Sequence, residues 1–161
     1  MTTRTHSAVK IIHAGLSDLE AVVGLFEGYR AFCRKEPDPV GAREFIRQRL
    51  NTQDSVIFLA VNEEGMGVGF TQLYPLFTSL RMKKLWLLND LFIHPDYRGR
   101  GISVQLIEQA KDLVRKSQAA GLTLETEKSN HIGNQLYPRT GFVLDTSNHF
   151  YVWDCPDVRN P

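Results

Sequence analysis

The chain has 161 residues, 42% hydrophobic and 23% charged, and a formal net charge of +1 at pH 7. These values are typical of one ordinary globular domain, and we expect a single domain over residues 1–161. The small net charge argues against non-specific binding to nucleic acid or to an anionic membrane, because both need an excess of positive charge. Two cysteines are too few for a disulfide framework.

The hydropathy of the chain predicts a cytoplasmic protein with no membrane partner. Residues Met1–Ala8 contain no apolar core of a signal peptide. No uncharged apolar run approaches the ~18 residues that a bilayer-spanning helix needs. The one basic cluster, Arg81–Lys84, is short, and we interpret it as a solvated turn rather than a binding site for nucleic acid.

The first half of the chain predicts one strand, two helices and then three strands. Val9–His13 is a short candidate strand. Ser17 and Glu20 have the spacing of a capping box, and apolar residues at helical spacing continue to about Lys35. A second helix carries Phe45 on its apolar face. The three following strands are expected at Val56–Val61, Gly67–Tyr74 and Leu85–Ile93.

The second half begins with a glycine-rich turn and a long amphipathic helix, which starts near Ile102 and stops near Gly121. The remaining elements are a strand at Leu122–Glu127, a helix at Asn130–Tyr137, and closing strands at Phe142–Leu144 and Phe150–Trp153. The resulting order, βααβββαβαββ, predicts an α/β fold. Its central sheet is mixed but mostly antiparallel and is flanked by about four helices.

The glycine-rich turn before the long helix has the properties of an anion site. Gly99 and Gly101 permit backbone angles that other residues avoid and let a ligand approach the main chain. The first N–H groups of the helix lack intrahelical partners and lie at its positive dipole end. Arg98 and Arg100 add positive charge. Taken alone, the turn is equally consistent with one that binds nothing, and it has neither a Walker lysine nor the third glycine of a dinucleotide fingerprint.

Two motifs in order resemble those of the GNAT acetyltransferases. The first, Arg98-x-x-Gly101-x-Ser103, is similar to the pyrophosphate-binding signature R/Q-x-x-G-x-G/A, and Leu88–Pro95 before it resembles the family's fourth strand. The second, Asn130-x-x-Gly133-x-x-Leu136-Tyr137-x-x-x-Gly141-Phe142, is similar to N-x-x-A-x-x-L-Y-x-x-x-G-F. Ser103 departs from the family's glycine or alanine. Pro138 departs too, because it disfavours helical angles at Tyr137.

The resemblance implies an acetyl-CoA-dependent N-acetyltransferase of the GNAT fold. It implies that the cofactor is held by Leu91, Phe92, Ile93, Arg98, Gly99, Arg100, Gly101, Ile102, Ser103, Val104, Asn130 and Tyr137. A homodimer, which is common in the superfamily, is a further expectation. We expect no metal, because His131 has no second histidine or cysteine at ligand spacing.

Acetyl transfer to an amine requires removal of a proton from the amine, donors for the developing oxyanion and a proton for the leaving thiolate. Tyr137 suits the last task because a phenol stays protonated at neutral pH, and the resemblance places the matching residue beside the cofactor sulfur. Glu125, on the face of its strand opposite Leu122, matches a carboxylate that some family members use as a base. Asp90 is the second candidate base, although a buried structural acceptor is an equally good interpretation.

The acceptor pocket has weaker signals in the sequence. Asn89 stands where polyamine-type members of the family carry a catalytic glutamate, and we expect it to position substrate or water. Further candidates fall in segments that form the acceptor wall in this family: Tyr29, Phe32, Glu36, Asp38, Tyr74 and Phe77. Acids with aromatic rings suit a small cationic amine, such as an amino acid, a polyamine or a xenobiotic. Alternatively, Phe32 and Tyr74 are core residues and Glu36 lies in a solvated loop.

Two other functions remain open from the sequence. A protein acetyltransferase that acts on lysine or on an N-terminus would have an open cleft rather than a closed acidic pocket. A non-catalytic acyl-CoA-binding module would lack Tyr137 or the glycine-rich turn, and both are present.

Overall fold

The computed structural model describes residues 8–156 and 158. The predicted absence of a signal peptide concerns Met1–Ala8, which lie outside these residues apart from Ala8. The chain divides into two compact units: the first ends at Glu125 and the second begins at Thr126. None of the described helices is long and apolar enough to cross a membrane.

From residue 8 onward, the first unit contains one five-stranded sheet with the strand order β1-β2-β3-β4-β5. Neighbouring strands pair antiparallel up to β4, and β5 pairs parallel to β4. The predicted mixed, mostly antiparallel sheet is therefore confirmed. The strands are β1 (Lys10–His13), β2 (Val56–Val61), β3 (Gly67–Thr78), β4 (Lys83–Ile93) and β5 (Leu122–Thr123).

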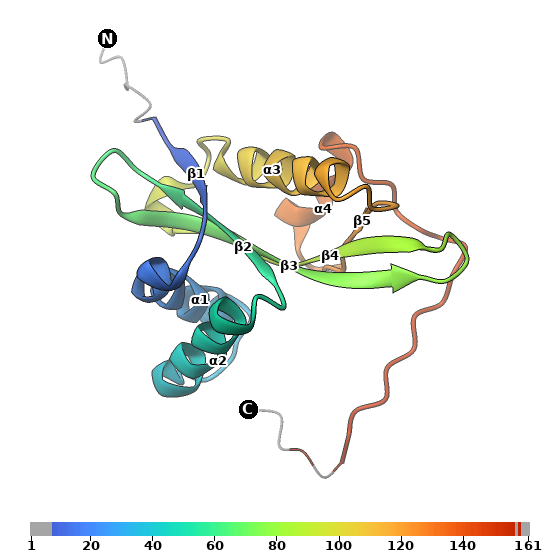
Figure 1. The fold of residues 1–161 in the computed structure, drawn as a ribbon, viewed down its shortest axis with the longest axis horizontal. Helices are drawn as coiled ribbons and strands as arrows, with labels where there is room; N and C mark the ends of the chain where they lie inside the picture. Colours follow the sequence, from blue (N-terminus) through green and yellow to red (C-terminus); the bar gives the residue numbers. More distant parts are fainter. Residues whose placement is uncertain (1–7, 157, 159–161) are drawn as a thin grey trace. The chain divides into compact units, whose positions relative to one another are not determined.

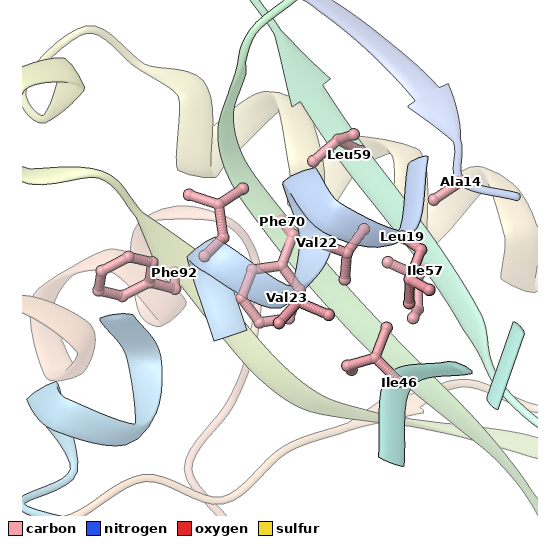
Figure 2. Packing of buried hydrophobic residues seen from close by; sticks show 10 residues of the cluster. Ala14, Leu19, Val22, Val23, Ile46, Ile57, Leu59, Phe70 and Phe92 are labelled. Atoms are coloured by element: carbon pink, nitrogen blue, oxygen red, sulfur yellow. The ribbon is translucent and has the colours of Figure 1, made fainter. Parts of the chain in front are cut away.

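Of the four α-helices in the described residues, three belong to the first unit: α1 (Leu19–Phe32), α2 (Pro39–Thr52) and α3 (Ile102–Lys116). Helices α1 and α2 lie on one side of the sheet, and α3 lies on the other (Figure 1). The buried cluster on the first side joins α1 and α2 to β2 and β3, with Phe70 and Ile46 fully buried in it (Figure 2). The alternation of β2 explains this, because Ile57 and Leu59 share that face.

The predicted capping box at Ser17 is wrong. A short 3₁₀ turn, Leu16–Asp18, precedes α1, and the Asp18 carboxylate accepts a hydrogen bond from the backbone N–H of Gly15 at 2.9 Å. Asp18 therefore supplies the acceptor that the sequence pattern assigned to Glu20, because the chain turns two residues earlier than the spacing suggested.

The strand predicted at Leu122–Glu127 is also shorter in the structure. Only Leu122 and Thr123 pair with β4, opposite Trp86 and Leu87. Beyond that point β4 has a bulge, described below, which interrupts the regular pattern that a longer partner strand would need. Glu125 is therefore exposed in irregular chain rather than held on a strand.

The second unit contains α4 (His131–Arg139), and irregular chain follows it. The closing strands predicted at Phe142–Leu144 and Phe150–Trp153 are not formed in the structure. Alternating apolar residues favour an extended chain, but a strand also needs a neighbour to receive its backbone hydrogen bonds. Side chains of these segments are largely exposed: Val143 is 91% exposed and Tyr151 is 86% exposed.

Candidate active site

The glycine-rich turn joins β4 to α3 in the first unit. Gly99 and Gly101 have φ angles of 72° and 76°, in the left-handed region that favours glycine. A Cβ atom built on either residue would have no heavy atom within 4 Å. Glycine is thus required for the backbone angles, while the space beside the turn is open. Gly101 is the N-cap of α3, so the N–H groups of Ile102, Ser103 and Val104 lie at the helix start.

Both arginines of the turn are held by backbone carbonyls. The Nε of Arg98 donates to the carbonyl of Ile93 at 3.1 Å, and Nη2 of Arg100 donates to the carbonyl of Asp96 at 2.8 Å. Each guanidinium also lies near an aromatic ring: Arg98 is 5.6 Å from the ring centroid of Phe92. Fixed positive charge beside open helix N–H groups fits a diphosphate, which is the group that the cofactor would place there.

A bulge interrupts β4 near its middle. Gln72 of β3 stands opposite Asp90, but the next residue, Leu73, stands opposite Leu88. Asn89 is therefore the extra residue and is left out of the regular pairing. A bulge of this kind re-aims side chains and frees backbone groups, which is useful where a strand must contact a ligand.

Asp90 is a buried carboxylate beside this bulge, with a side chain only 3% exposed. Its two oxygens accept hydrogen bonds from Gln72 Nε2 at 2.8 Å and from Asn89 Nδ2 at 3.0 Å. Burial raises the pKa of Asp90, and hydrogen bonds from Gln72, Asn89 and Tyr29 partly oppose that rise. Ser55 extends the network, because its hydroxyl donates to Gln72 at 2.9 Å. All of these partners are neutral.

Two tyrosines face the same carboxylate. Burial, and then the negative charge of Asp90, raise the pKa of Tyr29 far above its ordinary range. Burial and Asp90 also raise the pKa of Tyr74, with Arg49 opposing them. Both phenols therefore stay protonated at any pH at which an enzyme works. The structure thus brings together Tyr29, Tyr74, Asn89 and Asp90, which the sequence had placed in three separate segments.

The remaining acceptor candidates lie outside this group of residues around Asp90. They are Phe32, Glu36, Asp38 and Phe77. Phe32 lines a groove of about 730 Å³ along α1, together with Gly28, Phe92 and Arg98. Glycine at position 28 lets α1 approach β4 closely beside this groove, because a Cβ there would lie 2.9 Å from the Phe92 ring. Glu36 is exposed in the loop between α1 and α2.

Asp38 has a structural role, because it caps α2 through a hydrogen bond from the N–H of Gly41 at 2.9 Å. Phe77 is 79% exposed near the end of β3.

Tyr137 and Asn130 belong to the second unit. The ring of Tyr137 packs edge-on against Phe142 with their centroids 5.8 Å apart, and burial raises the pKa of its phenol. Asn130 caps α4, since its Oδ1 accepts from the N–H of Gly133 at 3.1 Å. Pro138 does not end the helix before Tyr137, because α4 continues to Arg139. A proline this close to the helix end removes only one hydrogen bond of the last turn, because it lacks a backbone N–H.

The comparison with known families decides the identity of the fold and its chemistry. The model of the acetyltransferase (GNAT) family matches residues 23–142. The chain belongs to this family. An uncharacterized N-acetyltransferase of Bacillus subtilis, YhfO, is 40% identical over 148 residues, which cover 92% of this chain and 99% of the relative. The chain is accordingly an acetyl-CoA-dependent N-acetyltransferase.

Solved structures of the family agree with this fold. The crystal structure of a probable acetyltransferase has a TM-score of 0.87 at 32% identity and covers 92% of this chain and 99% of its own. The aminoglycoside N-acetyltransferase AAC(6')-Iy, solved with CoA, has a TM-score of 0.78 at 19% identity, over 96% of this chain and 100% of its own. At that identity the second match shows the shared fold alone.

The sequence did not identify Gln72 or Ser55 as parts of the Asp90 network. A signal was available, because Thr71 and Gln72 are two consecutive polar residues within an apolar strand, and both are fully buried. Thr71 donates from its hydroxyl to the backbone carbonyl of Asp90 at 2.8 Å. Polar residues in such positions need partners, and only the strand register shows that their partner is Asp90.

Acetyl-CoA is expected to raise the melting temperature of the protein, whereas NAD and ATP are not. A ligand present at about 100 times its Kd stabilises the folded state by about 2.7 kcal/mol, which corresponds to roughly 5–10 °C for a chain of this size. Thermal unfolding with each nucleotide at equal concentration measures the effect. A larger shift with NAD or ATP would contradict our assignment of the anion site.

Proposed function

We propose that this N-acetyltransferase acts on the primary amine of a small cationic molecule. In this proposal, Tyr29, Tyr74, Asn89 and Asp90 bind the amine beside the bulge of β4. The observation that supports it most strongly is the Asp90 carboxylate, which is buried and, among residues 8–156 and 158, has only neutral hydrogen-bonding partners. A buried charge without a counter-ion is costly, and an ammonium group of the substrate would supply the missing positive charge.

The two tyrosines complete the recognition of a cation. The faces of aromatic rings attract ammonium groups, and phenols that stay protonated can form hydrogen bonds without adding a charge. Asn89 donates one amide N–H to Asp90, so the rest of its amide remains for the substrate or for water. A carboxylate with two aromatic rings is a chemical environment for an amine rather than for a hydroxyl acceptor.

In the proposed reaction, Asp90 first pairs with the ammonium group and then accepts its proton. Its raised pKa makes the carboxylate a better base than an exposed aspartate would be. The neutral amine nitrogen then attacks the thioester carbonyl carbon, and the carbon–sulfur bond breaks. Acetyl-CoA supplies the activated acetyl group. Tyr137 is proposed to donate its phenolic proton to the departing sulfur, and the second proton that the nitrogen loses as the amide forms restores the phenol. The glycine-rich turn, from Arg98 to Val104, would hold the diphosphate, with the backbone from Leu91 to Ile93 along the pantetheine arm.

Consumption of acetyl-CoA against a panel of amines tests the acceptor class. The panel contains amino acids, polyamines, aminoglycosides, and peptides with a free lysine or N-terminus. The proposal is supported if small cationic amines are turned over efficiently and peptides are turned over poorly. Turnover of peptides alone would overturn it in favour of a protein acetyltransferase.

Asp90→Asn is expected to raise the KM for the accepted amine about 10- to 100-fold while the KM for acetyl-CoA changes little. Hydrogen bonds to charged groups are worth about 1.5–3 kcal/mol, and asparagine cannot pair with an ammonium charge. Steady-state kinetics with each substrate varied in turn measures both constants. Asp112→Asn, on the surface of α3, is the matched control, because it removes a carboxylate that is paired with Arg115.

The dependence on pH provides a second readout for the same residue. Below its raised pKa, Asp90 is protonated and no longer attracts a cation. The KM for the amine should therefore rise as the pH falls through that pKa, and this increase should be absent in Asp90→Asn. The same acidic increase in the variant would show that another group binds the amine.

A further inference from the structure

Gln72 is a fully buried amide next to the carboxylate to which we assign amine binding. Its side chain is 0% exposed. It shares one face of β3 with Phe70, because side chains two positions apart in a strand point to the same side of the sheet. Phe70 belongs to the apolar cluster between the sheet and helices α1 and α2 (Figure 2). Gln72 therefore lies at the border of the hydrophobic core, where polar atoms need partners.

Each end of the Gln72 amide has a buried partner. Its Nε2 donates to Asp90 Oδ2 at 2.8 Å, and its Oε1 accepts from the Ser55 hydroxyl at 2.9 Å. Ser55 is itself only 9% exposed. Since Ser55 directly precedes β2, Gln72 belongs to β3 and Asp90 belongs to β4, this chain of hydrogen bonds links three neighbouring strands. The carboxylate is thus tied to the sheet itself and not to a loop.

The hydrogen bond from Ser55 determines which end of the Gln72 amide faces Asp90. An amide has a donor end and an acceptor end, and a rotation of 180° exchanges them. Because the Ser55 hydroxyl holds Oε1, the donor end faces Asp90. A donor stabilises the ionised carboxylate, whereas the acceptor end would stabilise its protonated form. Burial raises the pKa of Asp90, and among the hydrogen bonds that oppose this rise the one from Gln72 has the largest effect.

Other titratable and charged groups face Asp90 or its two tyrosines from α1, α2, β3 and the loop before β2: Tyr29, Cys33, Arg49, Asp54 and Tyr74. The cation among these groups, Arg49, pairs with Asp54 at 2.7 Å. The two tyrosines stay protonated. The negative charge of Asp90 in the substrate-free protein therefore depends on neutral donors, of which Gln72 is the most deeply buried.

We propose that Gln72 is a positioning residue of this acetyltransferase, and that Ser55 sets the orientation of its amide. Gln72 holds the Asp90 carboxylate in the charged form that binds the amine, and it acts through Asp90. The inference rests on the proposed function of Asp90 as the amine-binding carboxylate. It assigns a role in the reaction to two uncharged residues that lie outside both sequence motifs.

The pH dependence of stability tests the contact without any substrate. Gln72→Met keeps the length of the side chain and removes both polar ends of the amide. Its effect on the urea-unfolding equilibrium should be about tenfold larger above the pKa of Asp90 than below it, because the lost donor stabilises the charged carboxylate. Gln48→Met is the matched control, since Gln48 donates to Glu44 at 3.0 Å on the exposed surface of α2.

Asp90→Asn provides the reference background, in which the effect of Gln72→Met should no longer change with pH. Ser55→Ala should give a smaller effect with the same pH dependence, and it carries the test if Gln72→Met does not fold. Ser55→Thr restores the hydroxyl and should reverse the effect. A destabilisation that is equal at every pH, in both Gln72→Met and Ser55→Ala, would show that these residues only pack, and the proposal would be wrong.

The pH profile of kcat/KM for an accepted amine tests the link to the reaction. The acidic limb of this profile should move to higher pH by about one unit in Gln72→Met and by less in Ser55→Ala, while Gln48→Met leaves it in place. A limb that stays in place in both variants but disappears in Asp90→Asn would overturn the role of Gln72 and leave the proposed function intact. A limb that persists in Asp90→Asn would overturn the proposed function, and this inference with it.

Discussion

Gly101→Glu is expected to abolish detectable binding of CoA while the protein remains folded. Gly101 lies at the start of α3, where the N–H groups of the first turn face open space. A carboxylate there would repel a diphosphate and occupy its position. Two like charges about 4 Å apart repel by about 4 kcal/mol near a protein surface, which corresponds to roughly a thousandfold loss of affinity.

Isothermal calorimetry with CoA measures this loss, and a melting curve establishes that the variant is folded. Gly101→Gln is the matched control, because glutamine has the size of glutamate without its charge. Both variants carry the same backbone strain, since the φ angle of 76° disfavours any residue with a Cβ. If Gly101→Glu binds CoA more weakly than Gly101→Gln, the difference measures the effect of the negative charge. Equal and unchanged affinity in both would show that the diphosphate lies elsewhere.

Tyr137→Phe is expected to lower kcat by about a hundredfold with little change in the KM for acetyl-CoA. The substitution keeps the ring that packs against Phe142 and removes only the hydroxyl. General acid catalysis is typically worth ~10²–10⁴-fold, and a thiolate is already a fair leaving group, so the lower end of this range applies. An interaction made mainly in the transition state lowers kcat and kcat/KM together.

Steady-state kinetics with an accepted amine measures the effect, again with a melting curve for each variant. Tyr151→Phe is the control, because it removes the hydroxyl of a tyrosine that is 86% exposed. A nearly unchanged kcat in Tyr137→Phe would show that Tyr137 contributes packing and not acid catalysis. Positioning of the thioester would then be the main source of catalysis.

The sequence by itself determined the family, the element order up to α4 and the glycine-rich turn. These features depend on local pattern: helical and strand periodicity, the two glycines, and motif spacing between Arg98 and Phe142. Local signals were sufficient because each of these elements forms from residues that are close in the chain. The same signals failed at the closing strands, where alternation predicted extended chain but could not supply a pairing partner.

Only the tertiary structure decided which candidate acceptor residues lie together. Tyr29 comes from α1, Tyr74 from β3, and Asn89 and Asp90 from β4, so their proximity depends on strand register and helix packing. The bulge at Asn89 sets Asp90 opposite Gln72, and no local pattern in the sequence of β4 predicts this bulge. Register is a property of two strands at once, and for that reason the buried network around Asp90 could be seen only after the sheet had been assembled.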